Sequence, residues 1–375
     1  MSPPLPAEIM NEIFRSIELE DADLYNCCLV SRQQLPSARR WMYHSLRVAL
    51  LSSKVVNSDG AEREDWQYDS RTWRSFRSLS DNEELPRAVR AIQFTFKGEG
   101  TDSQAIRTLP THAVSNFVGL APSVRRLFFM GKDYDWTAEA LPQLVESRSA
   151  GIRGLYMEVL SPTGTRLASE MKGLKQLACR EESEDFDFDD CSIPANLEGF
   201  RIGTVDDLQI VPFLQPSANT LVYLHLPFNA FLDLDFTQLP KLQRLEVSLE
   251  DSEVDLDTNN SAVWSTYSRS AIITLAFDGS PDDRDLNDHL FGSQQLFLRK
   301  APPSLQRIEI LKTVSLDQIQ GLLQCGGLKE LALPNDQLDD LTATAVQAMC
   351  SLAGTQFIRR TEGSVVLPSR SLLLG

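Results

Sequence analysis

The chain has little cysteine and no long apolar run, which argues against a disulfide-rich secreted protein and against a membrane-spanning one. Six cysteines among 375 residues lie mostly inside apolar patterns, so we expect reduced thiols and a cytoplasmic or nuclear location. The adjacent Cys27 and Cys28 do not suit a metal or redox pair. No stretch approaches the roughly 20 apolar residues of a membrane span, and no signal-peptide pattern is present.

Positive charge is also scarce. The chain has 36 Lys and Arg against 52 Asp and Glu, which gives a formal net charge of −16. Nucleic-acid binding requires a broad basic footprint, so we predict no nucleic-acid partner. The same excess of negative charge disfavours anionic lipid, so we predict no membrane partner either. The hydrophobic content of 42% is ordinary for a chain that folds.

The motifs of common catalytic sites are missing. There is no phosphate-binding glycine loop, no His-Glu-x-x-His and no Cys-x-x-Cys. The four histidines, at positions 44, 112, 225 and 289, have no metal-ligand spacing. We therefore expect a protein that is not an enzyme and has no catalytic residue, no cofactor and no metal site.

One pattern is abundant, the six-residue frame apolar-x-x-apolar-x-apolar. It occurs ten times between residues 89 and 333, as VRAIQF, VRRLFF, IRGLYM, LKQLAC, LEGFRI, LVYLHL, LQRLEV, IITLAF, LQRIEI and LKELAL. Successive copies start 35, 28, 22, 23, 24, 21, 30, 33 and 23 residues apart. The last two apolar positions alternate at period two, as in a strand with one buried face, and the first anchors the incoming turn.

Helix-like stretches separate the copies, at residues 103–120, 204–215, 284–300 and 315–324. A strand and a helix every 20–29 residues resemble the unit of a leucine-rich repeat. The resemblance implies an α/β fold from residue 86 onward, an irregular solenoid with a parallel concave sheet. Only Asn229 matches the Asn that this family carries after the strand. A doubly wound α/β domain is the alternative, but the regular spacing in the centre favours the solenoid.

A repeat array needs caps at its ends. Residues 51–85 are polar and mixed, and we expect their later part, which begins at residue 71, to form a helix under the first strand. Beyond Leu333 the frame is lost, and a last helix followed by a strand or tail is expected. The predicted domains are a helical domain at 1–48, a connector with a capping helix at 49–85, and the repeat domain with its C-terminal cap at 86–375.

Residues 5–48 predict three short helices. Pro6 suits a first helical turn, where its missing N–H is no loss. Ile9, Ile13 and Ile17 then share one apolar stripe. A second helix is expected after Asp23, and a third from about Leu35 to Leu46. So small a unit buries little surface by itself, which indicates either a partner or a cap on the repeats.

The same segment carries an ordered set of motifs: Leu-Pro-x-Glu-Ile, Ile-Phe, Asp-Leu, Leu-Val-Ser-Arg and a closing WMYHSLRV. This set resembles the F-box, and its position before repeats resembles the fungal type of F-box protein with leucine-rich repeats. The matching residues are Leu5, Pro6, Glu8, Ile9, Ile13, Phe14, Asp23, Leu24, Leu29, Val30, Ser31 and Arg32. Gln34 departs from the pattern, because the family usually has Trp there.

The resemblance implies the non-catalytic substrate-recognition subunit of a Skp–cullin–F-box ubiquitin ligase. The F-box would bind the Skp-type adaptor, which joins the cullin scaffold, and the repeats would bind an unknown target protein. The adaptor-binding residues would be Leu5, Pro6, Glu8, Ile9, Ile13, Phe14, Leu24, Leu29 and Val30. The alternative is a repeat protein that binds partners outside ubiquitination.

The third and fifth positions of each frame should line the concave face, where repeat proteins commonly bind. They supply the predicted target-binding residues Arg126, Phe128, Tyr156, Arg201, Tyr223, His225, Arg244 and Arg307. We expect the aromatic side chains among them to be half-exposed. The arginines could recognise an acidic or phosphorylated segment. Alternatively, they are solvated strand residues that pair with Glu246 and Glu309.

Residues 181–190, EESEDFDFDD, form the most acidic run. The run lacks the Gly and the closing Glu of a calcium-binding EF-hand loop. We interpret it as a solvated loop between repeats, with contact to a basic partner as the alternative.

Overall fold

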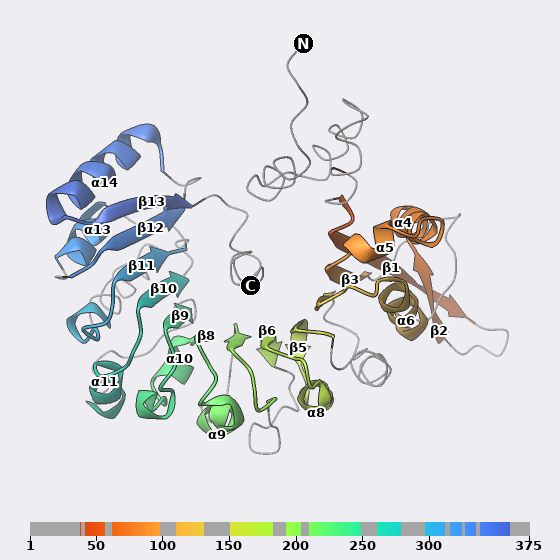
Figure 1. The fold of residues 1–375 in the computed structure, drawn as a ribbon, viewed down its shortest axis with the longest axis horizontal. Helices are drawn as coiled ribbons and strands as arrows, with labels where there is room; N and C mark the ends of the chain where they lie inside the picture. Colours follow the sequence, from red (N-terminus) through yellow and green to blue (C-terminus); the bar gives the residue numbers. More distant parts are fainter. Residues whose placement is uncertain are drawn as a thin grey trace, which may run out of the picture. The chain divides into compact units, whose positions relative to one another are not determined.

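The computed structural model of the protein describes residues 38, 42–56, 62–97, 110–130, 151–182, 193–203, 210–248, 261–278, 297–311, 316–324, 327–334 and 338–360. These residues form a mixed α/β fold with a thirteen-stranded, mostly parallel sheet. The strand order is β13-β12-β11-β10-β9-β8-β7-β6-β5-β4-β3-β1-β2. From β3 onward the order along the sheet follows the order along the chain, so the prediction of consecutive parallel strands is confirmed (Figure 1).

All ten repeated frames form strands, and each strand begins at the third frame position. The ten strands are β3 (Ala91–Lys97), β4 (Arg126–Met130), β5 (Gly154–Leu160), β6 (Gln176–Glu182), β7 (Gly199–Ile202), β8 (Tyr223–Pro227), β9 (Arg244–Ser248), β10 (Thr274–Asp278), β11 (Arg307–Ile310) and β12 (Glu330–Pro334). The fourth and sixth positions are buried throughout, as Leu224 and Leu226 illustrate. The frame therefore marks one continuous apolar face of the sheet, as its period of two predicts.

The chain divides into two compact units, residues 1–178 and 179–375. In the first unit, β1 (Ser45–Val56) pairs in parallel with β3 and antiparallel with β2 (Glu62–Tyr68). The expectation of a helix reaching Leu46 is thus wrong at its end, because Leu46, Val48 and Leu50 alternate as buried strand residues. The proposed boundary at 48/49 falls inside β1, and part of the expected connector belongs to the sheet.

Helices α4 (Ser70–Ser80), α5 (Leu85–Ala88), α6 (Pro110–Leu120) and α8 (Pro162–Glu170) complete the described part of the first unit. A helix, α4, thus lies within the segment expected to cap the repeats. It is held to α6 by aromatic contacts, since the rings of Phe76 and Phe117 lie 5.4 Å apart. Tyr68, at the end of β2, contacts both of these rings and joins the strand to the helices.

In the second unit the described helices lie on one side of the sheet (Figure 1). They are α9 (Ile210–Leu214), α10 (Phe228–Phe231), α11 (Ser261–Tyr267), α13 (Leu316–Leu323) and α14 (Asp340–Ala353). Beneath them Phe231, Trp264, Tyr267 and Phe297 form a buried aromatic cluster, in which the Phe231 and Phe297 rings are 4.5 Å apart. The opposite side of the sheet, on which none of the described helices lies and which we call the helix-free face, carries the third and fifth frame positions.

The expected C-terminal cap is present as helix α14 followed by strand β13 (Gln356–Arg360), which extends the sheet in parallel beside β12. Helix α14 ends at Gly354, whose φ of 72° is left-handed and favours glycine. Cys179 and Cys350 are buried and are not in disulfide bonds, as expected of core cysteines. Among the described helices, none has both the length and the apolar character to cross a membrane.

Candidate functional site

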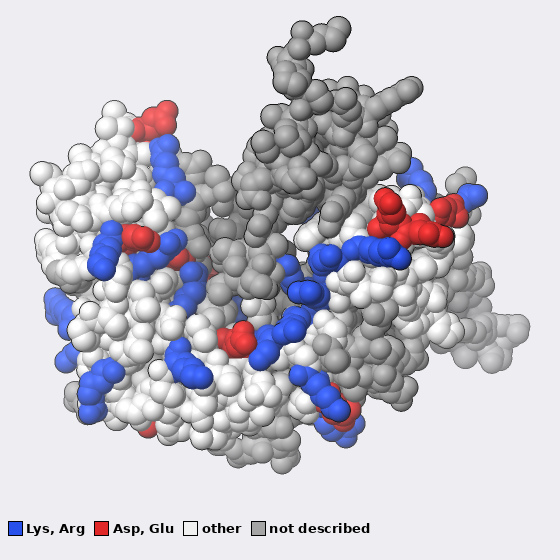
Figure 2. Space-filling model, in the orientation of Figure 1, with Lys and Arg blue, Asp and Glu red and all other residues white. Residues whose placement is uncertain are grey.

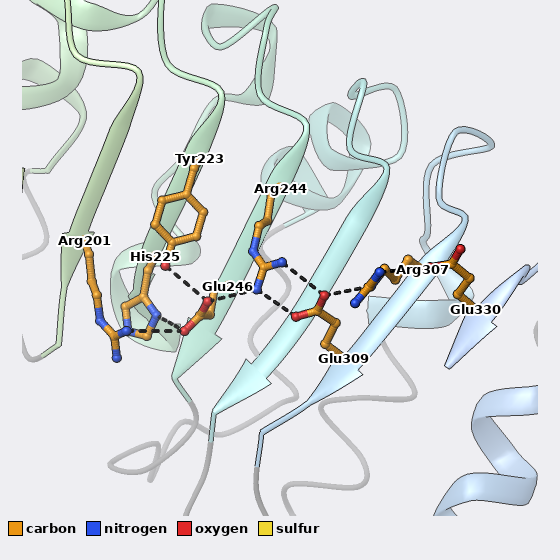
Figure 3. A network of polar contacts seen from close by, with 8 residues as sticks. All are labelled: Arg201, Tyr223, His225, Arg244, Glu246, Arg307, Glu309 and Glu330. Atoms are coloured by element: carbon orange, nitrogen blue, oxygen red, sulfur yellow. Dashed lines mark hydrogen bonds and ion pairs between the residues drawn. The ribbon is translucent and has the colours of Figure 1, made fainter. Parts of the chain in front are cut away.

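A network of charged side chains covers the helix-free face of the second unit (Figure 3). The strand register aligns its members in two rows. The fifth-position row contains Arg201, His225, Glu246, Ala276, Glu309 and Ala332, and the third-position row contains Gly199, Tyr223, Arg244, Thr274, Arg307 and Glu330. The repeated frame thus places residues from six strands side by side, although they span about 130 positions of sequence.

Glu246 is the first centre of this network. Its carboxylate is 2.8 Å from Nδ1 of His225, and it accepts a hydrogen bond of 3.1 Å from the Tyr223 hydroxyl. His225 and Glu246 are only 1% and 4% exposed. An acid this deeply buried is stable only when it is well paired, and the neighbouring strands supply its partners.

Two arginines add positive charge around Glu246. Arg201 Nη1 lies 3.8 Å from one carboxylate oxygen, and Arg244 Nη2 lies 3.6 Å from the other. Burial acts to raise the pKa of Glu246, but the charge and hydrogen bond of His225, together with both arginines, outweigh it and hold the pKa below its usual value. Glu246 is therefore held as a carboxylate inside the fold.

Glu309 is the second centre and is fully buried. Arg244 donates two hydrogen bonds to it, from Nη1 over 3.0 Å and from Nη2 over 2.7 Å. Arg307 Nε lies 2.7 Å from Glu309 Oε1 as an ion pair, and its Nη1 donates to Glu330 over 2.9 Å. A bidentate arginine–carboxylate pair fixes both direction and distance, so Glu309 holds these two arginines against the sheet.

The small side chain of Ala276 makes this geometry possible. In the fifth-position row Ala276 lies between Glu246 and Glu309, one strand from each. Since an alanine fills little of that space, Arg244 can reach across β10 to Glu309 on β11. The contact joins residues 65 positions apart.

The pKa values of Asp278 and Tyr223 are affected by the same charged neighbours. Burial raises the pKa of Asp278, and the nearby Glu246 raises it further, against the charges of His225 and Arg201. Arg201 Nη2 is 3.8 Å from Asp278. Burial also raises the pKa of Tyr223 well above its usual value, so its hydroxyl keeps its proton and donates to Glu246. The guanidinium of Arg244 lies 5.8 Å from the Tyr223 ring centroid, a cation–π contact.

The structure therefore brings together five of the predicted target-binding residues, Arg201, Tyr223, His225, Arg244 and Arg307. It also confirms the alternative in which arginines of this face pair with Glu246 and Glu309. The arginines are less solvated than in that alternative, because the side chains of Arg201, Arg244 and Arg307 are 20%, 18% and 31% exposed and both carboxylates are buried. Asp278 was not predicted from the sequence, whereas Glu330 occupies a third frame position, which the rule places on this face.

The three remaining predicted residues, Arg126, Phe128 and Tyr156, lie in the first unit. The rings of Phe128 and Tyr156 are neighbours in register, with centroids 6.1 Å apart. The expectation of half-exposed aromatic residues is wrong for Phe128 and Tyr223, which are 8% and 7% exposed, while Tyr156 is half-buried. Neighbouring side chains on adjacent strands lie about 5 Å apart, so large rings cover one another.

The predicted adaptor-binding residues, from Leu5 to Val30, lie outside the described residues, and so does Gln34. Among the residues that the structure describes, no group of three His, Cys, Asp or Glu side chains is placed to hold a metal ion. No model of a known protein family matches the chain, and no curated protein is similar to it in sequence.

The arrangement has a clear chemical consequence. The guanidinium groups of Arg201, Arg244 and Arg307 already contact carboxylates of the protein itself. A phosphate or an acidic side chain would have to compete with a bidentate, buried partner at Arg244. The network is therefore suited to fixing the strands and the shape of this face, and poorly suited to binding an anion at its centre.

Proposed function

We propose that the chain is the substrate-recognition subunit of a Skp–cullin–F-box ubiquitin ligase. The observation that carries the proposal is the succession of parallel strands and helices that follows an F-box-like segment in the sequence. Successive parallel strands of this kind offer a broad surface to which a target protein can bind. The F-box-like segment supplies an apolar stripe that a small helical unit cannot bury by itself.

In this proposal the two parts have separate tasks. Leu5, Pro6, Ile9, Ile13 and Leu24 contact the Skp-type adaptor, which brings the chain to the cullin scaffold. The repeat sheet holds the target, so that lysines of the target face the ubiquitin-conjugating enzyme. The chain itself performs no bond-making step.

Adaptor binding is the decisive test. The full chain is co-expressed with a Skp-type adaptor and purified through a tag on the chain. We expect the adaptor to co-purify in a stoichiometric amount, and the double substitution Ile9→Glu and Ile13→Glu to abolish it. Point variants are preferable to removing residues 1–48, because that deletion would cut into strand β1, which begins at Ser45.

A matched control places the same change where no partner is proposed. Leu341 and Leu352 are 85% and 90% exposed on helix α14, so Leu341→Glu with Leu352→Glu should leave adaptor binding intact. If the folded, unaltered chain does not bind the adaptor, the proposal is wrong. The remaining function would then be a repeat protein that binds partners outside ubiquitination.

A further inference from the structure

A second charged feature lies on the first unit, at the second position of four consecutive frames. Its residues are Arg90, Arg125, Arg153 and Lys175, and we call them the basic row. Each of the four directly precedes the first residue of a strand in the sheet. The second frame position had no role in the expected binding face, which used the third and fifth positions.

Backbone hydrogen bonds hold the basic row in line. The N–H of Arg125 donates to the carbonyl of Arg90 over 2.9 Å, that of Arg153 to Arg125 over 2.7 Å, and that of Lys175 to Arg153 over 2.8 Å. Neighbouring strands are about 4.8 Å apart, so the four residues span about 14 Å. Because the backbone bonds are regular, the positions of the four Cα atoms do not depend on their side chains.

The basic row reaches solvent. Arg125 and Arg153 are exposed, and Arg90 and Lys175 are partly exposed. Figure 2 shows basic side chains, in blue, following one another across the surface of these strands. Arg126, beside the row, lies across the neighbouring strand, since a Cβ on Gly154 would be only 3.2 Å from its Cγ. A glycine at position 154 therefore leaves space for this fifth basic side chain.

The fold does not impose this charge. The second unit repeats the same backbone ladder, with residues of mixed character at the second frame position. These are Glu198, Val222, Gln243, Ile273, Gln306 and Lys329. One geometry thus carries four successive cations in the first unit and a mixed set in the second, which separates the basic row from a general property of the strands.

The charge of the whole chain decides which partner fits. At physiological salt, attraction between charges fades over about 8 Å, so the basic row attracts only a ligand that is in contact with it. The net charge of −16 on the whole chain repels large polyanions. Nucleic acid would need many more phosphate contacts than four. A length of 14 Å matches about four to five residues of extended polypeptide. We propose that the basic row binds an acidic polypeptide segment running across the strands.

This inference rests on the proposed function in one respect, since the acidic segment would belong to the target of the ligase. It also moves the expected binding site for an acidic segment from the third and fifth frame positions to the second. Among the arginines expected to recognise an acidic segment, Arg244 and Arg307 contact buried or partly buried carboxylates of the chain, whereas Arg125 and Arg153 of the basic row are exposed.

Direct binding tests the basic row without any adaptor. A fluorescent oligoglutamate peptide of about eight residues is titrated with the full chain at about 50 mM salt, and anisotropy is measured. We expect saturable binding that weakens as salt is raised. Arg125→Gln with Arg153→Gln should weaken it about fivefold, because each exposed charge contact contributes modestly.

The control keeps the net charge equal. Gln243→Glu with Gln306→Glu lowers the formal charge from −16 to −18, as the arginine substitutions do, but at the same frame position of the second unit. The control variant should bind the peptide as the unaltered chain does.

Three results would overturn the proposal: no peptide binding at low salt, an equal loss in both variants, or tighter binding of an oligothymidylate of equal length. None of them depends on the adaptor experiment, so failure of the basic row and failure of the ligase proposal can be told apart.

Discussion

At the scale of single residues, Glu309 is the most consequential charge of the second unit. It is fully buried and contacts both Arg244 and Arg307. Glu309→Gln would remove the buried carboxylate that both cations contact, so that Arg244 keeps only its 3.6 Å contact with Glu246 and Arg307 keeps only Glu330. Breaking a buried pair in this way costs about 3 kcal/mol. We expect a clear fall in the urea midpoint of unfolding.

Glu330→Gln is the matched comparison, since Glu330 also contacts Arg307 but its side chain is 36% exposed. A partly solvated pair contributes less than about 1 kcal/mol, so the midpoint should move little. Equal losses in the two variants would show that burial of Glu309 has no energetic consequence.

Acid sensitivity is argued at the same scale. The pKa of Glu246 is lower in the folded chain than its ordinary value of 4.5, so the unfolded chain binds the proton more readily. Its contribution to stability is therefore present above about pH 4.5 and is lost as the pH falls further. Glu246→Gln should flatten the fall of the urea midpoint between about pH 5 and pH 3.

The contribution of Asp278 to the pH dependence of stability has the opposite sign. Burial raises its folded-state pKa, so its protonation favours the folded chain as the pH falls. Asp278→Asn removes that gain and should make the acid loss steeper. If both substitutions flatten the profile, the assignment of the two carboxyl groups is wrong.

At the scale of elements, Thr72 joins helix α4 to strand β1. It is buried, its backbone N–H donates to Asp69 at the N-cap over 2.6 Å, and its hydroxyl accepts from the N–H of Ala49 over 2.8 Å. Thr72→Val keeps the shape but leaves the Ala49 N–H without this acceptor, which should cost about 1–3 kcal/mol. Thr72→Ser keeps a hydroxyl and should retain more of the stability in the same urea titration. If serine is no better than valine, the hydrogen bond is not the cause.

The secondary structure elements also show how much of this fold can be predicted from the sequence. Ten strands could be predicted because one frame repeats, and its last two apolar positions lie on the same face. Strand β1 differs from the helix expected to reach Leu46, although Leu46, Val48 and Leu50 alternate at period two. The segment also resembles the close of an F-box, and a short apolar run fits both the helical and the strand period.

The candidate site was less predictable than the strands. The frame places Arg244 and Glu309 on one face, but their pairing depends on register and on the small Ala276 between them. Burial of Phe128 and Tyr223 likewise depends on which side chains adjoin them on the next strand. The basic row is present in the sequence at the second frame position, but its exposure is shown only by the structure.

At the scale of the whole molecule, the order of strands makes stability a local property. Along β3 to β13 each strand is hydrogen-bonded only to its neighbours in the order, so a perturbation should weaken as it passes from strand to strand. Glu309→Gln is expected to speed amide hydrogen exchange most in β10, β11 and β12, by up to about a hundredfold if about 3 kcal/mol is lost there. Strands β3 to β5, in the other compact unit, should exchange as in the unaltered chain. An equal increase in all of these strands would mean that the chain unfolds as one cooperative body, and the two units would then have no separate stability. Thr72→Val provides the reciprocal measurement, because its effect should be largest in β1 and β3 and absent from β10 to β12.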